Sequence, residues 1–245
     1  MTIKTNQMKK ITSLLIALLI SSVSIQAQKL IKGNGNIITK SRSVGDFDNI
    51  ALAGHFDVTL KKGNEGEITI KAEENLMEYI ETKVDDGKLK IKMKKNFRFR
   101  STKSIHLTIA FSEFNGVAVS GSGNVQSEAL IKANEFGIAL SGSGGMNLNI
   151  SAQHVKSAIS GSGNISLEGE TDSFTCAVSG SGNVNCYELK AQNVNAKVSG
   201  SGNIKVYASN SIEAHSSGSG NIYYKGNPKT EKAKSSGSGS VKSKE

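Results

Sequence analysis

The chain has 245 residues, with 30 Lys and Arg against 21 Asp and Glu, 26 Gly, one Pro and no Trp. This length suffices for one or two domains, and the many glycines without any Trp favour an all-β repeat protein. Removal of the export signal described next takes away Lys4, Lys9 and Lys10 and lowers the formal net charge from +9 to +6, so the mature chain is only mildly basic. Nucleic acid is not an expected partner of an exported chain.

Residues 1–27 have the organisation of a secretory signal peptide. Met8-Lys9-Lys10 precedes an apolar run from Ile11 to Ile20, and small or polar residues then lead to Ala27. The run is too short to span a membrane comfortably, so we expect cleavage after Ala27 and no transmembrane segment afterwards. No Cys follows the run, which disfavours a lipid anchor. The sequence therefore predicts an exported protein of the periplasm, the outer cell surface or the extracellular medium.

Residues 28–115 are predicted to form the less regular N-terminal half of a β structure. Only Glu73–Thr82 interrupts the strand pattern, and it allows one or two turns of a single short helix. We expect this half to continue into the solenoid described below. Apolar and polar residues alternate with period two, the pattern of strands with one buried face, near Phe47–Leu52, Phe56–Leu60, Ile68–Ala72, Leu89–Met93 and Ile105–Ala110.

A run of basic residues extends from Lys88 to Lys103, with no acid between Asp86 and Glu113. Its first lysines alternate with apolar residues, which predicts a strand with a cationic exposed face. Two interpretations follow. The lysines either solvate a sheet edge and discourage aggregation, or they contact anionic glycans or lipid headgroups.

The pentapeptide Ser-Gly-Ser-Gly-Asn recurs through residues 116–226 and, in altered form, near the C-terminus. A nearly fixed period of 18 to 21 residues is typical of stacked units. One unit buries too few apolar side chains to offset the entropy of ordering its backbone, so neighbouring units must complete the core. The sequence therefore predicts an all-β, single-stranded parallel β-helix, a solenoid with coils of about 19 residues. Its glycine pairs begin at Gly121, Gly142, Gly161, Gly180, Gly200, Gly218 and Gly237.

The glycines fall in the inward register, at corners where a Cβ has little room. Cys176 and Cys186 flank one such corner in the same register. Export permits a disulfide between them, and two buried thiols are the simpler alternative, while their spacing without a His neighbour does not match a metal site. Residues 227–245 place Glu231 and Ser235 at inward positions, so this last unit is expected to fray or to form a polar cap.

The chain resembles the head GIN domain of putative auto-transporter adhesins from about residue 44 to residue 225. The resemblance implies an exported, right-handed β-helix of the cell envelope, and this family supplies no catalytic residues to carry over. It rests on Phe47-Asp48-Asn49-Ile50, on Gly54-His55-Phe56-Asp57-Val58-Thr59-Leu60, on Asp86-Gly87-Lys88-Leu89-Lys90-Ile91 and on the Ser-Gly-Ser-Gly-Asn array.

Ser and Asn side chains recur on the outward side of the corners. Stacked at about 4.8 Å, they form hydroxyl and amide ladders that either stiffen the corner through mutual hydrogen bonds or bind a cell-surface glycan or an envelope protein. The candidate binding residues are Ser122, Asn124, Ser162, Asn164, Ser181, Asn183, Ser201 and Asn203.

No catalytic set is visible in the sequence. A β-helix polysaccharide lyase or hydrolase needs paired acids or a metal, whereas the acids of the repeats do not recur at one position, and calcium-binding repeats need a recurrent Asp. We therefore expect no cofactor, no metal site and no enzymatic activity. The sequence favours an adhesin-like or interaction module of the cell envelope. A structural or stress-associated envelope protein without a dedicated ligand is the alternative, and a β-helix polysaccharide-degrading enzyme is a distant third.

Overall fold

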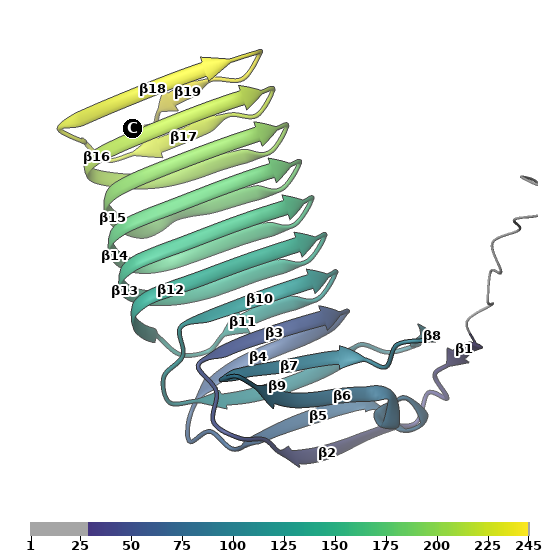
Figure 1. Cartoon of the computed structure of the whole chain (residues 1–245). Coiled ribbons are helices and arrows are strands. Elements are labelled where there is room, and N and C mark those ends of the chain that lie inside the picture. The colour runs from purple at the N-terminus through teal and green to yellow at the C-terminus, as the bar shows by residue number, and fades with distance from the viewer. Residues whose placement is uncertain (1–28, 245) are drawn as a thin grey trace, which may run out of the picture.

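The computed structural model describes residues 29–244, so the predicted signal peptide lies outside the described residues. Parallel strands stack into a solenoid of about seven turns, each of about 19 residues (Figure 1). This arrangement confirms the predicted all-β solenoid and the length of its coils. The strands of the solenoid are β3 (Asn49–Gly54), β4 (Phe56–Lys62), β10 (Gly116–Gly121), β11 (Asn124–Ser127), β12 (Ile131–Gly142), β13 (Gly145–Gly161), β14 (Asn164–Gly180), β15 (Asn183–Gly200), β16 (Asn203–Gly218), β17 (Ile222–Lys225), β18 (Thr230–Ser236) and β19 (Val241–Ser243).

Successive coils stack with their glycine corners aligned. Gly142 pairs with Gly121 on one side and with Gly161 on the other. Two residues before the corners from Gly54 to Gly200, an apolar side chain points inward, and Leu140 and Ile159 at this position are at most 2% exposed. Because these coils place an apolar residue at the same point of the turn, the core continues along the axis until Ser216 takes this position.

The two glycines of a corner are required for different reasons. Gly161 has a left-handed φ of +122°, and a Cβ there would lie 2.5 Å from the carbonyl oxygen of Gly142 in the preceding coil. Gly163 is buried, and a Cβ there would lie 2.5 Å from Cδ2 of Leu140. The sequence interpretation assigned both glycines to the interior. Only Gly163 lies in the interior. Gly161 must be glycine because of its left-handed backbone conformation and because the preceding coil leaves no room for a Cβ.

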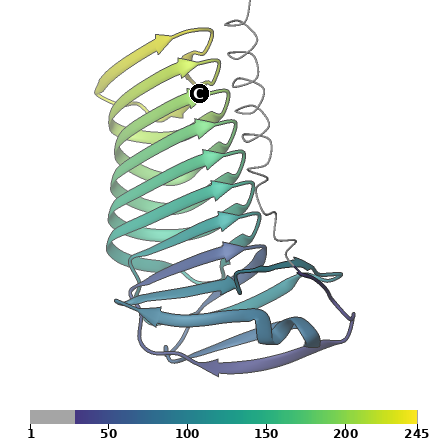
Figure 2. The same cartoon turned by 45° about the vertical axis from the view of Figure 1, so that its right-hand side comes forward.

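A cap of antiparallel strands closes the N-terminal end of the solenoid. Strands β3 and β4 form the first coil, with β10 and β11 stacked on one side and the cap strands β7 and β9 on the other. The pairs β2–β5, β5–β9 and β6–β7 are antiparallel and cover this end (Figure 2). The cap consists of β1 (Lys29–Lys32), β2 (Ile37–Ser43), β5 (Glu67–Glu73), the 3₁₀-helix η1 (Glu74–Tyr79), β6 (Ile80–Asp85), β7 (Lys88–Met93), β8 (Phe97–Arg100) and β9 (Ile105–Phe111).

The short helix confirms the interruption predicted at Glu73–Thr82. The antiparallel pairs were not predicted, because alternation of apolar and polar residues shows which face of a strand is buried and not the direction of its neighbour.

A buried carboxylate fastens two loops of the cap. Glu73 is 1% exposed and accepts hydrogen bonds from the amide of Gly35 at 2.7 Å and from Oγ1 of Thr102 at 2.6 Å. Burial by itself raises the pKa of Glu73, but hydrogen bonds from Thr102, Gly35 and Lys103 outweigh it and hold the pKa below its ordinary value. The carboxylate is therefore ionised at neutral pH and joins segments far apart in the chain.

A second charged group binds the end of η1. Nη2 of Arg42 donates to the carbonyl of Met77 at 2.7 Å, and Nη1 donates to the carbonyl of Ile80. Burial lowers the pKa of Arg42, and its guanidinium joins β2 to carbonyl groups at the C-terminal end of η1.

The cationic strand predicted at Lys88–Met93 is not a sheet edge, so that interpretation was wrong. Strand β7 lies between β3 and β6. Its exposed lysines are partly neutralised by acids of β6, since Lys90 lies 2.5 Å from Asp85 and Lys92 lies 3.2 Å from Glu81.

Cys176 and Cys186 are free, buried thiols in one coil. Burial raises the pKa of Cys186 to about 12, and burial together with the nearby Cys186 raises that of Cys176. Of the two alternatives that the sequence left open, the structure has the pair of core thiols.

The last coil is formed, but Val241 is the apolar side chain that it packs against the core within residues 227–244. Strand β18 pairs with β16, and β19 pairs with β17. Every residue of β18 is exposed, because Glu231 and Ser235 occupy positions that hold core residues in the coils below.

Candidate functional site

The eight predicted binding residues lie along one edge of the solenoid, at the stacked glycine corners. The amide of Ser162 donates to the carbonyl of Gly142 at 2.9 Å, and the amide of Ser181 donates to that of Gly161 at 2.9 Å. The side chains of Ser122, Ser162, Ser181 and Ser201 are exposed, and their hydroxyls bond no other residue within 29–244. The serines therefore present a row of free hydroxyls, one per coil, about 4.8 Å apart.

The asparagines bond one another instead. Nδ2 of Asn183 donates to Oδ1 of Asn164 at 3.0 Å, and both the amide and Nδ2 of Asn203 donate to Oδ1 of Asn183. The same pattern continues to Asn221, and Oγ of Ser240 donates to Oδ1 of Asn221 at 2.8 Å. This row is an amide ladder whose groups are largely used inside the protein, which stiffens the corner.

The ladder is interrupted where the motif carries Gly145. On the far side of the gap, Nδ2 of Asn124 donates to Oδ1 of Asp57 at 2.9 Å, and Asp57 pairs in register with His106. The row therefore begins with His106 and Asp57, two residues that were not among the predicted binding residues. The change from Asn to Gly at position 145 was visible in the motif and is the signal that marks the gap.

Beside the interruption, the outer surface has a hollow of about 480 Å³, lined by polar side chains and by Val58, Val125 and Met146. The ends of the two ladder segments border it, and amide, carboxylate, imidazole and hydroxyl groups are among the groups that line it. Groups of these kinds form hydrogen bonds with the hydroxyls of a sugar or another polyol. The polar groups of the hollow belong to Asp57, Thr59, His106, Asn124, Gln126, Asn147, Asn164 and Ser166.

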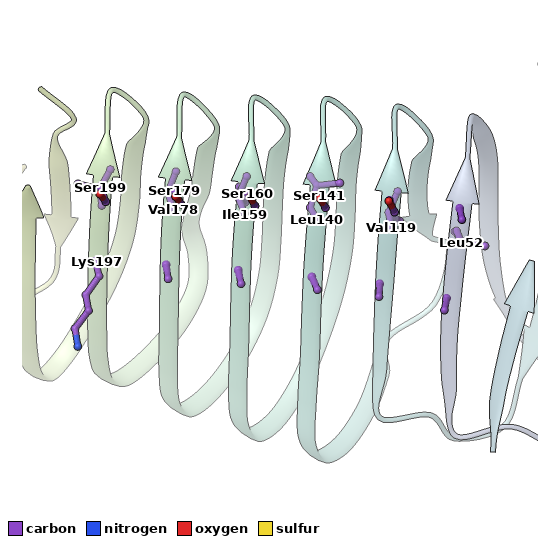
Figure 3. Close-up of a pocket in the computed structure, with 18 of the residues that line it drawn as sticks. Leu52, Val119, Leu140, Ser141, Ile159, Ser160, Val178, Ser179, Lys197 and Ser199 are labelled. Carbon is purple, nitrogen blue, oxygen red and sulfur yellow. The ribbon is translucent and has the colours of Figure 1, made fainter. Parts of the chain in front are cut away.

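A second surface lies on the strands that precede the corners. Ala118, Ala139, Ala158 and Ala177 stack in register and are exposed, and Lys197 follows them in the next coil. Figure 3 shows the labelled serines Ser141, Ser160, Ser179 and Ser199 beside this row, with Lys197 at its end. The middle of this surface is regular and apolar, because its exposed side chains are methyl groups and small hydroxyls, whereas Lys90, Lys92, Lys197 and His215 lie at its ends.

The described part of the chain holds no group of three or more His, Cys, Asp or Glu side chains placed to bind a metal. His55 and His106 lie in the cap and first coil, whereas His154 and His215 are separated along the coils. Within residues 29–244 no helix has the length and apolar character needed to cross a membrane.

The chain matches the sequence model of the family described as "Putative auto-transporter adhesin, head GIN domain" over residues 46–228. No curated protein matches it. A crystal structure of a putative adhesin from Bacteroides fragilis NCTC 9343 is 26% identical, covers 87% of this chain and 100% of its own, and has a TM-score of 0.84.

Two crystal structures from Parabacteroides distasonis ATCC 8503 are also similar. One, named a putative lipid binding protein, is 27% identical, covers 89% of this chain and 100% of its own, and has a TM-score of 0.76. The other, named a putative adhesin, is 22% identical, covers 88% of this chain and 100% of its own, and has a TM-score of 0.72. At this identity the similarity shows the fold alone.

Proposed function

Because the chain belongs to the family of the putative auto-transporter adhesin head GIN domain, we propose that it is an exported, non-enzymatic adhesin-like module of the cell envelope that binds a surface glycan along its serine and asparagine edge. The 26% identical structure from Bacteroides fragilis, named a putative adhesin, supports the general class. The ligand and the location are parts of the proposal.

The observation that carries the proposal is the difference between the two polar rows. The asparagines are hydrogen-bonded to one another, so they serve mainly to hold the corner. The serine hydroxyls are exposed and free within the described chain, and the hollow at Gly145 adds polar groups beside them. A glycan chain laid along the axis meets a hydroxyl at every coil and a deeper polar site at one point.

The test is binding of the mature chain to a glycan array and to whole bacterial cells. Joint replacement Ser162→Ala, Ser181→Ala and Ser201→Ala removes three free hydroxyls and is expected to weaken binding without changing the melting temperature. Gly145→Asn should abolish the part of the binding that depends on the hollow. Unchanged binding by both variants would reject the serine and asparagine edge as the site.

Asn164→Ala with Asn183→Ala is the companion variant. It removes three hydrogen bonds of the amide ladder as well as two side-chain amides, so it is expected to lower both binding and stability. If the array and the cells show no ligand for the unaltered chain, the alternative of a structural or stress-associated envelope protein without a dedicated ligand takes its place.

A second candidate function, binding of a lipid, is favoured by the apolar alanine row. The 27% identical structure named a putative lipid binding protein gives this candidate its chemical class. Ala158→Asp places a charge in the middle of the row and should reduce retention of a fluorescent fatty acid, whereas Ser162→Ala at the corner should not. Equal retention by both variants would remove this candidate.

A further inference from the structure

Tyrosine and lysine alternate on the outer face of the last four coils, in the strands that follow the corner. Along one column, Lys205 pairs with Tyr223 and Tyr223 pairs with Lys242. In the next column, Lys190 pairs with Tyr207 and Tyr207 pairs with Lys225. The two residue types therefore form a checkerboard, in which each type has the other as its neighbour along the axis.

Each tyrosine ring of this checkerboard is contacted by a lysine ammonium group. Nζ of Lys190 lies 4.6 Å from the ring centroid of Tyr207, and Nζ of Lys225 lies 5.0 Å from that of Tyr187. Lys244 lies 5.4 Å from the ring of Tyr223. Such contacts favour the cation over an aromatic face, so they hold the lysine side chains in place and reduce the entropy lost when a partner binds.

Charge on this face is almost entirely positive. After the corner, the outward positions of β16 as far as Tyr207, and those of β17 and β19, carry no acid. Acids lie at the border of the face, where Glu170 pairs in register with Lys190 and Glu188 lies 3.4 Å from it. The remaining ammonium groups of Lys205, Lys225 and Lys242 have no ion-pair partner within the described residues, and together they produce a local positive potential.

The tyrosines make this face different from a plain basic patch. Tyr187, Tyr207 and Tyr223 are half-buried, and a lysine ammonium group lies over each ring, so aromatic and cationic groups are offered side by side. Burial raises the pKa of Tyr187, and the nearby Tyr223 raises it further. The hydroxyl of Tyr187 therefore stays protonated and can donate a hydrogen bond.

We propose that the Tyr–Lys checkerboard is a binding site for an acidic polysaccharide whose sugars carry carboxylates. The two columns taken together supply one ammonium group per coil, alternately from each column, so successive groups advance along the axis by the coil spacing of about 4.8 Å, a length comparable to one sugar residue of an extended chain. Carboxylates pair with the lysines, while the sugar rings pack on the tyrosine edges and bond their hydroxyls.

A membrane surface fits this face less well. Among residues 29–244, the large hydrophobic side chains that are exposed are Leu30 and Leu130, and neither belongs to the checkerboard. The face therefore lacks an apolar group to insert among acyl chains. The inference goes beyond the proposed function, because it concerns a surface separate from the free serine hydroxyls and names a different ligand chemistry.

The experiment measures binding of the full mature chain to polygalacturonate, with neutral dextran as the uncharged probe. Joint replacement Lys205→Gln, Lys225→Gln and Lys242→Gln is expected to weaken binding to polygalacturonate about tenfold, the effect of losing three exposed ionic contacts. Tyr207→Leu with Tyr223→Leu keeps apolar bulk and removes the hydroxyls and rings, and it should weaken binding even with all lysines present. Melting curves of each variant report whether the coils remain folded.

The matched control is Lys40→Gln, Lys88→Gln and Lys132→Gln, which removes the same charge from exposed positions elsewhere. It should leave binding nearly unchanged. An equal loss in the control and the checkerboard variant would show that only net charge matters and would overturn the proposal, as would the absence of polygalacturonate binding. Binding to phosphatidylglycerol vesicles in preference to polygalacturonate would overturn it as well. The serine variants keep this surface intact, so failure of the serine edge and failure of the checkerboard give different patterns.

Discussion

In the coils between residues 116 and 226, each structural role is filled once per turn by the same type of residue, whereas in the cap each role is filled once by a unique residue. The corner glycines and the asparagine ladder hold the coils. Glu73 and Arg42 hold the cap through hydrogen bonds to segments distant in the sequence. The coils are therefore stabilised by contacts between repeated units, so that a substitution in one coil disturbs only the coils next to it. The cap instead depends on single side chains whose role no other residue repeats.

The largest expected effect is at a coil corner. Gly161→Val introduces a β-branched residue at φ +122° and places a Cβ 2.5 Å from a backbone oxygen of the preceding coil. Strain and overpacking together should cost about 2–6 kcal/mol, which corresponds to several degrees in melting temperature at this chain length. Ser162→Ala, one residue away, should change stability by less than about 0.5 kcal/mol. Equal effects in thermal denaturation would contradict the assigned roles.

The next largest effect is expected from Glu73→Gln, a substitution of one of the single groups that hold the cap. Glu73→Gln removes a charge that accepts hydrogen bonds from Gly35 and Thr102, and it should cost about 1–3 kcal/mol. Since hydrogen bonds hold the folded pKa below the ordinary 4.5, the stabilisation is present above pH 4.5 and is lost as the pH falls through the folded value. Denaturant melts between pH 7 and pH 3 should show a smaller loss of stability on acidification in the variant. An identical pH slope in both proteins would exclude Glu73 as a source of this stability.

A smaller effect concerns the core thiols. Cys176→Ala leaves a small void in a column whose next member is Ala196, so it should cost about 1 kcal/mol. Because burial raises the pKa of Cys186 to about 12, neither thiol should react with iodoacetamide at pH 8 until the protein unfolds. Mass spectrometry after alkylation measures this directly, and labelling of the folded protein would show that the coil opens locally.

The smallest expected effect comes from a substitution that fills the gap in the asparagine ladder at Gly145. Gly145→Asn restores the residue that the neighbouring motifs carry, in a backbone that does not require glycine, since Gly145 is absent from the positive-φ residues. The new amide would join the two ladder segments and stabilise the protein by about 0.5–1.5 kcal/mol, although its Cβ lies 3.0 Å from Oδ1 of Asn124. A lower melting temperature would show that this close contact outweighs the added bond.

The coils could be predicted from the sequence almost completely, and the cap only in part. The period of the glycine pairs and the alternation between them determine both the coil length and the buried face, and the structure confirms both. Alternation in the cap also identified strands such as Ile68–Ala72. It could not show that β5 pairs antiparallel with both β2 and β9, because either strand direction buries the same face.

The candidate binding residues show the same division. The motif predicted that Ser and Asn side chains form rows at one edge, and the structure places them there. It could not distinguish the serines, whose hydroxyls are free, from the asparagines, whose amides bond one another, because both types recur with the same period.

The sequence by itself determined the solenoid, the register of its coils and the positions of its corners, since a repeated local pattern has a repeated local structure and stacking of the copies satisfies the backbone. Tertiary structure alone decided the antiparallel closure of the cap, the free state of the two cysteines, the polar hollow at Gly145 and the pairing of lysine with tyrosine across coils. Each of these depends on distances between residues of different coils or strands. Such distances are set by packing in three dimensions, and the sequence marks at most the place of the gap at Gly145 and not the residues that meet there.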